Sequence, residues 1–325
     1  MSSSSNAPFH EGEKAVQARV GVRDKMEGIG HRAIRDAMPE QHQELFRKLP
    51  TLFVGSLDAQ RRPWASVLVG APGFIETPDE RTLRIRARPI DGDPLEGQLA
   101  PGLPLGLLGI EPHTRRRNRM NGSIEAVDDT GFTVGVDQSF GNCPKYIQAR
   151  EPQWLRDPGA PAPRHRVHAL GPALNEPACA LIGRADTLFI ASASPHARAH
   201  AGADGVDVSH RGGQRGFVRV DGGADGQVTL TLPDFQGNLM FNTLGNIVAW
   251  PHAGLLFIDH DHGDVLQLTG RAEVIWDGPQ VQSFALAQRL LQLRVDEARW
   301  LPGVLPLRWS APEFAPQLAA TGRWP

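Results

Sequence analysis

Three segments of the chain recur once, in the same order, in its second half. TLFVGS at 51–56 returns as TLFIAS at 187–192, PLGLLGIE at 104–111 resembles PHAGLLFID at 251–259, and NGSIEAVDD at 121–129 resembles TGRAEVIWD at 269–277. Each segment is short, rich in Val, Ile, Leu or Phe, and bounded by Gly, Pro or Asp, which is typical of antiparallel strands. The repeat therefore predicts two similar β domains, the second about a dozen residues longer.

The length and the proline pattern predict where these domains begin and end. A chain of 325 residues with 40% hydrophobic residues is long enough for two compact domains. The run EPQWLRDPGAPAPRH at 151–165 excludes a central strand or a regular helix, because its prolines lack N–H donors and restrict the residues before them. We predict a helical lead-in over 1–50, a first β domain over 51–150, a Pro-rich connection over 151–180 and a second β domain over 181–325.

Helices are predicted at two places outside the strands. Residues 28–49 have apolar residues at helical spacing, interrupted by Pro39, and predict two short helices. Residues 279–298 predict a C-terminal helix attached to the second β domain. Its apolar face would consist of Val281, Phe284, Ala285, Ala287, Leu290 and Leu291.

Charge and hydropathy narrow the classes of partner. The formal net charge is −2 and the sequence pI is about 6.6, so no global field attracts nucleic acid or an anionic membrane. No stretch approaches the ~20 apolar residues of a membrane span, and no signal peptide precedes the first strand. We expect a cytoplasmic protein that binds neither nucleic acid nor membrane, in which any phosphate site is local.

Cysteines and histidines give little support for a metal centre. Cys143 and Cys179 are too few for a disulfide framework and lack the spacing of a structural zinc site. His260 and His262, in DHDHGD, are expected in a surface turn rather than around a metal ion. We expect no metal site.

The motif DVSHRGGQRG at 207–216 is typical of an anion site at the end of a strand. Arg211 can form a forked contact to phosphate oxygens, Ser209 can donate from its hydroxyl, and Gly212 lets the backbone approach closely. His210 is either near the ligand or a hydrogen-bonded structural histidine. The competing interpretation of the whole motif is a Gly-rich hairpin with an exposed arginine.

A second polar motif, FQGNLMFNTLGNI, follows at 235–247. Amide and hydroxyl groups both donate and accept hydrogen bonds, so this run can satisfy a phosphate, hydroxyls or a polar ring edge. Its candidates are Asn238, Asn242, Thr243 and Asn246. The competing interpretation is that the asparagines cap turns and a short helix.

Two further segments carry candidate residues. In QSFGNCPKYIQAR at 138–150, Lys145 and Tyr146 are candidates for the mouth of a pocket, the alternative being a tight turn beside the connection. TRRRNR at 114–119 is basic enough to contact a phosphate or nucleic acid, although such a short run in a near-neutral protein more often forms a solvated or salt-bridged hairpin.

The repeated strand segments, both polar motifs and QSFGNCPKYIQAR together resemble the pyridoxamine 5'-phosphate oxidase-like FMN-binding split-barrel family, particularly members with tandem barrels. The resemblance spans about residues 9 to 280. It implies a mainly β fold, two tandem FMN-binding split barrels with flanking helices, in which the first barrel is a degenerate copy. The phosphate-binding strand and Ser-Arg-Lys turn of the oxidase itself are absent in those forms, so its substrate is not implied.

By this resemblance the expected cofactor is FMN and the expected activity is an oxidoreductase acting on a small substrate. The implied cofactor-binding residues are Ser209, His210, Arg211, Gly212, Asn238, Asn242, Thr243 and Asn246, with Lys145 and Tyr146 nearby. A reduced nicotinamide or a redox protein is the expected electron donor, and a homodimer the expected assembly. A binding module for flavin, haem or deazaflavin, or a redox-partner protein, is the alternative, and no catalytic residue is assigned.

Overall fold

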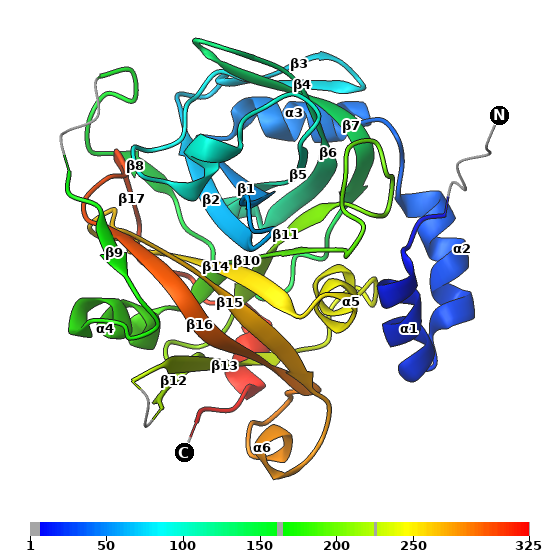
Figure 1. Ribbon diagram of the computed structural model, residues 1–325, viewed down its shortest axis with the longest axis vertical. Coiled ribbons are helices and arrows are strands. Elements are labelled where there is room, and N and C mark those ends of the chain that lie inside the picture. Colours follow the sequence, from blue (N-terminus) through cyan, green and yellow to red (C-terminus); the bar gives the residue numbers. More distant parts are fainter. Residues whose placement is uncertain (1–6, 161–164, 224–225, 325) are drawn as a thin grey trace.

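The computed structural model of the protein describes residues 7–160, 165–223 and 226–324. Residues 1–6 of the predicted lead-in and 161–164 of the predicted connection lie outside this range. The fold is mainly β, with two large antiparallel sheets and flanking helices, which confirms the predicted fold class (Figure 1).

The first sheet has seven strands in the order β2-β1-β5-β6-β7-β4-β3. Its short, apolar strands alternate with Gly, Pro and Asp turns, as the sequence pattern requires. The strands are β1 (Thr51–Leu57), β2 (Pro63–Val69), β3 (Ile75–Asp79), β4 (Thr82–Ile85), β5 (Pro104–Glu111), β6 (Arg116–Asp128) and β7 (Gly131–Gly141).

Seven strands of the second sheet repeat this order as β11-β10-β14-β15-β16-β13-β12, so each of the seven has a counterpart nine places earlier. The strands are β10 (Thr187–Ala193), β11 (Val206–Gly212), β12 (Arg219–Gly222), β13 (Val228–Asp234), β14 (His252–Ile258), β15 (Val265–Ile275) and β16 (Arg289–Leu301). The three recurring sequence segments fall on β1 and β10, β5 and β14, and β6 and β15. Closure of each sheet into a barrel and the exact domain boundaries remain predictions.

Helices cover the ends of these sheets. Pro39 separates two helices in the segment where two were predicted, because its fixed φ suits the N-cap of the second. The helices are α1 (Glu11–Arg19), α2 (Arg23–Ala33), α3 (Glu40–Lys48), α4 (Glu176–Arg184), α5 (Asn242–Ala249) and α6 (Pro279–Gln282). Helix α1 falls within the lead-in over 1–50 that was predicted to be helical, and it lies against α5 of the second half (Figure 1). None of the described helices is both long and apolar enough to cross a membrane.

The predicted helix at 279–298 is wrong. Only the single turn of α6 is helical there, and β16 begins at Arg289. Along β16, Leu291, Leu293 and Val295 are buried and alternate with more exposed residues, which is the two-residue period of a strand. Pairing with β15 on one side and β13 on the other stabilises the strand, so long-range hydrogen bonding overrides a local pattern that also suits a helix.

The described residues of the Pro-rich connection form no central strand, as its prolines predict. Its two short strands, β8 (Pro152–Trp154) and β9 (His168–Leu170), pair at the periphery with β17 (Leu307–Trp309) and with β16. Helix α4 begins inside the predicted connection, where the Asn175 side chain accepts from the Ala178 N–H and caps it.

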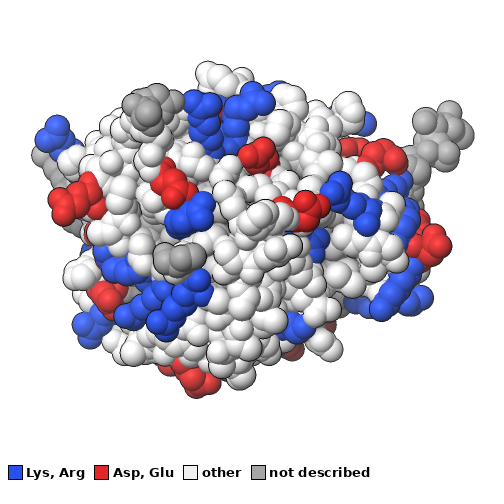
Figure 2. Space-filling view, turned by 90° about the horizontal axis from the view of Figure 1, so that it is seen from below, with Lys and Arg blue, Asp and Glu red and all other residues white. Residues whose placement is uncertain are grey.

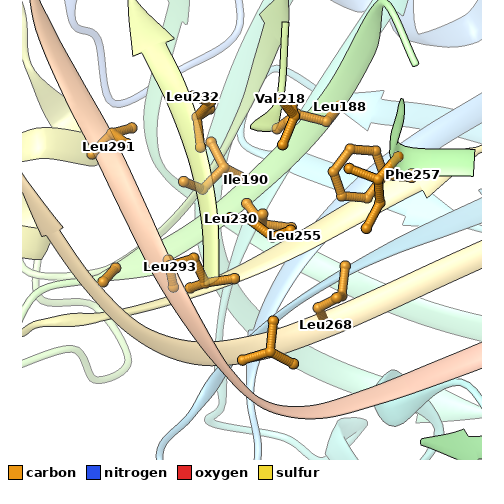
Figure 3. Packing of buried hydrophobic residues seen from close by; sticks show 14 of the residues in the cluster. Leu188, Ile190, Val218, Leu230, Leu232, Leu255, Phe257, Leu268, Leu291 and Leu293 are labelled. Atoms are coloured by element: carbon orange, nitrogen blue, oxygen red, sulfur yellow. The ribbon is translucent and has the colours of Figure 1, made fainter. Parts of the chain in front are cut away.

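Each sheet encloses an apolar core, and a third core joins the two sheets. In the second core, side chains from β10, β13, β14, β15 and β16 converge on one interior (Figure 3). The core between the sheets includes Phe53, Val67, Phe189 and Leu256. Burial of these apolar side chains away from water stabilises the packing of one sheet against the other.

Glycines permit the closest approach between the sheets. A Cβ atom at Gly106 of β5 would lie 2.5 Å from the Val206 carbonyl oxygen, and one at Gly254 of β14 would lie 2.3 Å from that of Pro63. These two glycines occupy equivalent positions in the repeat, since Gly106 pairs with Gly55 and Gly254 with Ala191. The sheets therefore meet through equivalent strands.

Candidate functional site

A pocket lies where β6 of the first sheet faces β11 and α5 of the second. The segments 142–146 and 233–241 complete its walls, and its cavity volume is about 90 Å³. Nine of the ten residues predicted from the sequence line it: Lys145, Tyr146, Ser209, His210, Arg211, Gly212, Asn238, Asn242 and Thr243. The two polar motifs and the segment at 138–150, far apart in the sequence, thus meet at one place.

Two arginines of the first sheet also line this pocket and were not predicted as its ligands. Arg117 and Arg119 lie two residues apart on β6, so the two-residue period of the strand places both on one face. Arg115 and Arg116 lie outside, where Arg115 forms an ion pair with Glu313 at 2.8 Å. Within β6, the alternation separates Arg117 and Arg119 from the exposed Arg116, whereas Arg115 precedes the strand.

Ser209 lies at the floor of the pocket, the surface formed by Arg117, Arg119, Ser209 and Arg211, and both acceptor positions of its oxygen are occupied. Its Oγ accepts hydrogen bonds from Arg119 Nη2 and from Thr243 Oγ1, the latter at 3.1 Å. A hydroxyl has two acceptor positions and one proton, so the Ser209 O–H remains available as a donor. The other terminal nitrogen of Arg119 donates to Asp207 Oδ1 at 2.9 Å, while its Nε has no partner among the described residues.

Arg211 lies two residues beyond Ser209 on β11 and also lines the pocket. Its Nη2 is 3.6 Å from Asp234 Oδ1, and Arg289 Nε is 3.3 Å from Asp234 Oδ2, so one carboxylate serves two guanidinium groups. Burial lowers the pKa of Arg211 and raises that of Asp234. The buried Nε of Arg211 has no partner in the described part of the chain.

His210 is held as a neutral ring with a defined tautomer. Arg117 Nη1 lies 3.1 Å from His210 Nδ1, and because a guanidinium only donates, Nδ1 must be the acceptor and Nε2 carries the proton. Burial, followed by the charges of Arg117 and Arg211, places the pKa of His210 well below its ordinary value. Burial and the nearby Arg211 also lower the pKa of Arg117 to about 9.

The first turn of α5 faces the pocket without a side-chain cap. Its N-cap residue, Phe241, has φ 63° and offers no side-chain acceptor to the free N–H groups of Asn242, Thr243 and Leu244. A helix start with free N–H groups favours an anion. Leu239, Phe241 and Tyr146, all lining the pocket, have left-handed backbone conformations that are unusual outside glycine.

The remaining predicted residues support the walls rather than the floor. Asn246 lies behind the pocket, where its Nδ2 donates to Asp207 Oδ2 at 2.8 Å and to Ser192 Oγ at 3.1 Å. Asn238 Oδ1 accepts from the Met240 N–H at 3.1 Å and so shapes the loop before α5. A Cβ atom at Gly212 would lie 1.9 Å from the Tyr146 carbonyl oxygen, so this glycine admits the 145–147 segment.

Aromatic rings form the side wall. The rings of Tyr146 and Phe235 lie with centroids 5.2 Å apart and planes tilted by 34°. Phe241 lies beneath the guanidinium of Arg289, 5.2 Å from its centroid to Cζ. The pocket therefore combines a cationic floor with an aromatic wall.

No family model and no curated protein matches this chain. Among solved structures it is similar to HupZ of Group A Streptococcus (12% identity, TM-score 0.29), over 38% of this chain and 91% of that one. It is also similar to a candidate pyridoxamine 5'-phosphate oxidase from Lactobacillus delbrueckii (16%, TM-score 0.28), over 39% and 93% of the two chains. A FAD-binding protein from Mesorhizobium loti (10%, TM-score 0.26) matches over 42% and 97%. These neighbours include the class of proteins that the sequence motifs resemble.

The repeat contains an equivalent of this pocket that is filled. Phe53 and Phe189 hold equivalent positions in the two sheets, so the strand pairings counted from them identify the equivalent of each pocket residue. Leu68 corresponds to Arg211, Val265 to Arg117, and Gln267 to Arg119. Ser66, the equivalent of Ser209, donates to Asp93 Oδ1 at 2.5 Å, and Gln267 Nε2 donates to Asp93 Oδ2 at 2.9 Å. In this filled pocket the side chains of the protein hydrogen-bond to one another. In the pocket lined by Arg119 and Arg211, by contrast, donors have no partner among the described residues.

Proposed function

We propose that the protein is an FMN-binding flavoprotein that holds the cofactor phosphate on the floor formed by Arg117, Arg119, Ser209 and Arg211. The observation that carries the proposal is a local excess of buried positive charge. The guanidinium groups of Arg117, Arg119 and Arg211 line the pocket, and Arg289 lies behind them on Asp234. These four groups face two carboxylates, Asp207 and Asp234, which leaves two positive charges before Lys145 is counted. A phosphate monoester near neutral pH carries a charge close to −2 and accepts several hydrogen bonds.

The donors fit a phosphate in kind as well as in charge. The unpartnered Nε atoms of Arg119 and Arg211, the free Ser209 hydroxyl and the start of α5 are all donors. The volume of about 90 Å³ is well below the ~300–1,000 Å³ of pockets that bury whole ligands, so it suits one end of a cofactor. The flavin ring would lie toward the open side, beside Tyr146 and Phe235.

The surface argues against a nucleic-acid phosphate at this position. On the face seen from below, basic and acidic side chains lie interspersed between wide uncharged areas (Figure 2). With a net charge of −2, the chain has no overall positive field that would attract a polynucleotide backbone. A small phosphate ester can bind at a local cationic floor without such a field.

Bound FMN would supply electron or hydride transfer, which is the basis for proposing an oxidoreductase. The protein's own residues would orient the cofactor and limit water at its phosphate. His210, as a neutral Nε2–H donor, would offer a hydrogen bond without a charge. The electron donor, reduced nicotinamide or a redox protein, the small substrate and a homodimeric assembly belong to the same proposal.

Haem has less support in this pocket. The His210 ring already accepts a hydrogen bond from Arg117, whose fixed positive charge opposes a metal cation at the same ring. His252, the other histidine considered from the sequence, does not line the pocket. A deazaflavin phosphate would use the same floor as FMN, so the test must identify the chromophore.

The visible absorption spectrum of the purified protein tests the proposal first, followed by release of the chromophore and its identification by mass. We expect flavin bands, or their appearance after FMN is added, and binding of FMN at least 10-fold tighter than that of riboflavin, which lacks the phosphate. Reduction by NADH or NADPH and turnover with an acceptor would then separate an enzyme from a binding module. A colourless protein that binds neither flavin contradicts the proposal.

A further inference from the structure

Helix α1, from the extreme N-terminal part of the described chain, contacts the start of α5, whose first residues line the pocket. Glu13 Oε1 accepts a hydrogen bond from the side-chain amide of Asn242, the first residue of α5. Its other oxygen accepts from the His10 backbone N–H at 2.9 Å. Glu13 is 2% exposed, so this contact is made in the protein interior.

The same helix also holds the loop that precedes α5. Gln17 Nε2 donates to the Met240 carbonyl oxygen at 3.1 Å, between the two left-handed residues Leu239 and Phe241. Glu13 and Gln17 therefore hold the start of α5 from both sides. Because left-handed residues cost ~1–3 kcal/mol each, they persist only where the surroundings fix them.

The packing of α1 on α5 leaves no room for adjustment. A Cβ atom at Gly245 of α5 would lie 2.5 Å from the Glu13 nitrogen, and one at Gly12 would lie 2.3 Å from the Gly245 carbonyl oxygen. The two helices thus touch through backbone atoms. The position of Glu13 relative to Asn242 is consequently fixed by main-chain contact rather than by flexible side chains.

The charges facing Glu13 determine which form it takes. From α1 it faces His10, from β11 Asp207, from β6 Arg119 and from α5 the amide of Asn242. Burial, and next the charge of Asp207, raise the pKa of Glu13 well above its ordinary value, although hydrogen bonds and Arg119 oppose this. An uncharged Glu13 preserves the excess of two positive charges on the floor.

We propose, on the basis of the proposed phosphate site, that Glu13 is a positioning residue that acts as an uncharged acid, holding Asn242 and the start of α5 in place for the phosphate. Binding of a phosphate dianion and protonation of Glu13 are then coupled, because an anion on the floor disfavours a second negative charge behind it. The N-terminal helix is thereby part of the cofactor site.

The test compares Glu13→Ala and Glu13→Gln in the full-length protein, with FMN and riboflavin as probes in a fluorescence titration. Glutamine can keep both hydrogen bonds if the Asn242 amide reverses, so we expect Glu13→Gln to bind FMN within about threefold of the unaltered protein. Glu13→Ala should bind FMN at least 10-fold more weakly, with little change for riboflavin. Glu11→Ala, on the exposed side of α1, is the matched control and should change neither.

A pH series provides the readout that a purely structural role would not affect. Above about pH 7 the FMN phosphate is a dianion, so its own titration contributes little. We expect FMN affinity of the unaltered protein to fall relative to that of Glu13→Gln as rising pH removes the proton from Glu13, because deprotonation of Glu13 opposes the anion.

Each outcome decides between the proposals. Equal FMN affinity of Glu13→Ala and the unaltered protein, or identical pH profiles of the unaltered protein and Glu13→Gln, would overturn the role of Glu13. Should Glu13→Ala fail to fold, the comparison with Glu13→Gln still decides. Absence of FMN binding by the unaltered protein would instead reject the proposed cofactor.

Discussion

Phe53 of β1 stacks on Phe189 of β10, with ring centroids 3.5 Å apart and planes inclined by only 13°. The two residues hold the same position in the repeated TLF segments and in the strand pairings of their sheets. Their contact lies in the core between the sheets, so the repeat relates the two halves of the molecule around this point. Equivalent pockets are therefore expected on either side of it.

We predict that the protein binds one flavin per chain and not two. In the equivalent pocket the three arginines are replaced by Leu68, Val265 and Gln267. The donors that remain there hydrogen-bond to Asp93. An anion there would meet a buried carboxyl group and no guanidinium floor. Titration with FMN followed by flavin quenching should saturate at one equivalent per chain, and saturation at two would contradict the asymmetry.

Arg211→Ala should weaken FMN binding by about 10–100-fold without unfolding the protein, corresponding to the ~1.5–3 kcal/mol of a hydrogen bond to a charged group. Because the side chain of Arg211 is 24% exposed, its removal should leave only a small buried space unfilled. Arg116→Ala is the control, because Arg116 is exposed on β6 and does not line the pocket. Unchanged affinity in Arg211→Ala, measured by fluorescence titration, would remove Arg211 from the site.

Gly254→Ala should destabilise the fold by about 1–3 kcal/mol, because its new methyl group would overlap the Pro63 carbonyl oxygen where the sheets meet. Urea unfolding should show a lower midpoint. Gly183→Ala is a matched control in α4, where a Cβ atom meets nothing within 4 Å. That substitution should raise stability by about 0.5–1 kcal/mol through helix propensity, so equal effects of the two substitutions would refute the contact.

Stability should decrease as pH rises from about 4 to about 6, to the extent that Asp93 determines it. Burial raises the pKa of Asp93 from 3.8 to about 6 in the folded protein, although its hydrogen bonds with Ser66, Leu95 and Gln267 oppose the shift. In this window the unfolded chain has lost the proton that the folded protein retains, so the contribution is complete below about pH 4 and lost as pH passes through about 6.

Asp93→Asn isolates this contribution from those of other groups. Relative to that of Asp93→Asn, the free energy of unfolding of the unaltered protein should fall by about 1–3 kcal/mol between pH 4.5 and pH 7. Urea titrations at the two pH values measure it. A difference that does not depend on pH would show that Asp93 titrates normally.

Local sequence was sufficient for much of the β structure and for part of the site. The strands at 51–57 and 187–193 follow from their β-branched and aromatic content, and the polar motif at 207–216 predicted donors that do line a pocket. The same local reasoning failed at 289–301, where a run compatible with a helix forms β16. Pairing with β13 and β15 decides that segment, and neither partner is visible in its own residues.

The sequence by itself determined that this chain repeats a β unit and gives its second copy a cluster of donors. Only the tertiary structure decided which surfaces meet there. Arg117 and Arg119 come from the first sheet, and Glu13 comes from an N-terminal helix more than 200 residues from Asn242. Such contacts arise from packing between surfaces distant in the chain, where burial and charge act through space, and periodicity within one segment does not specify its partner.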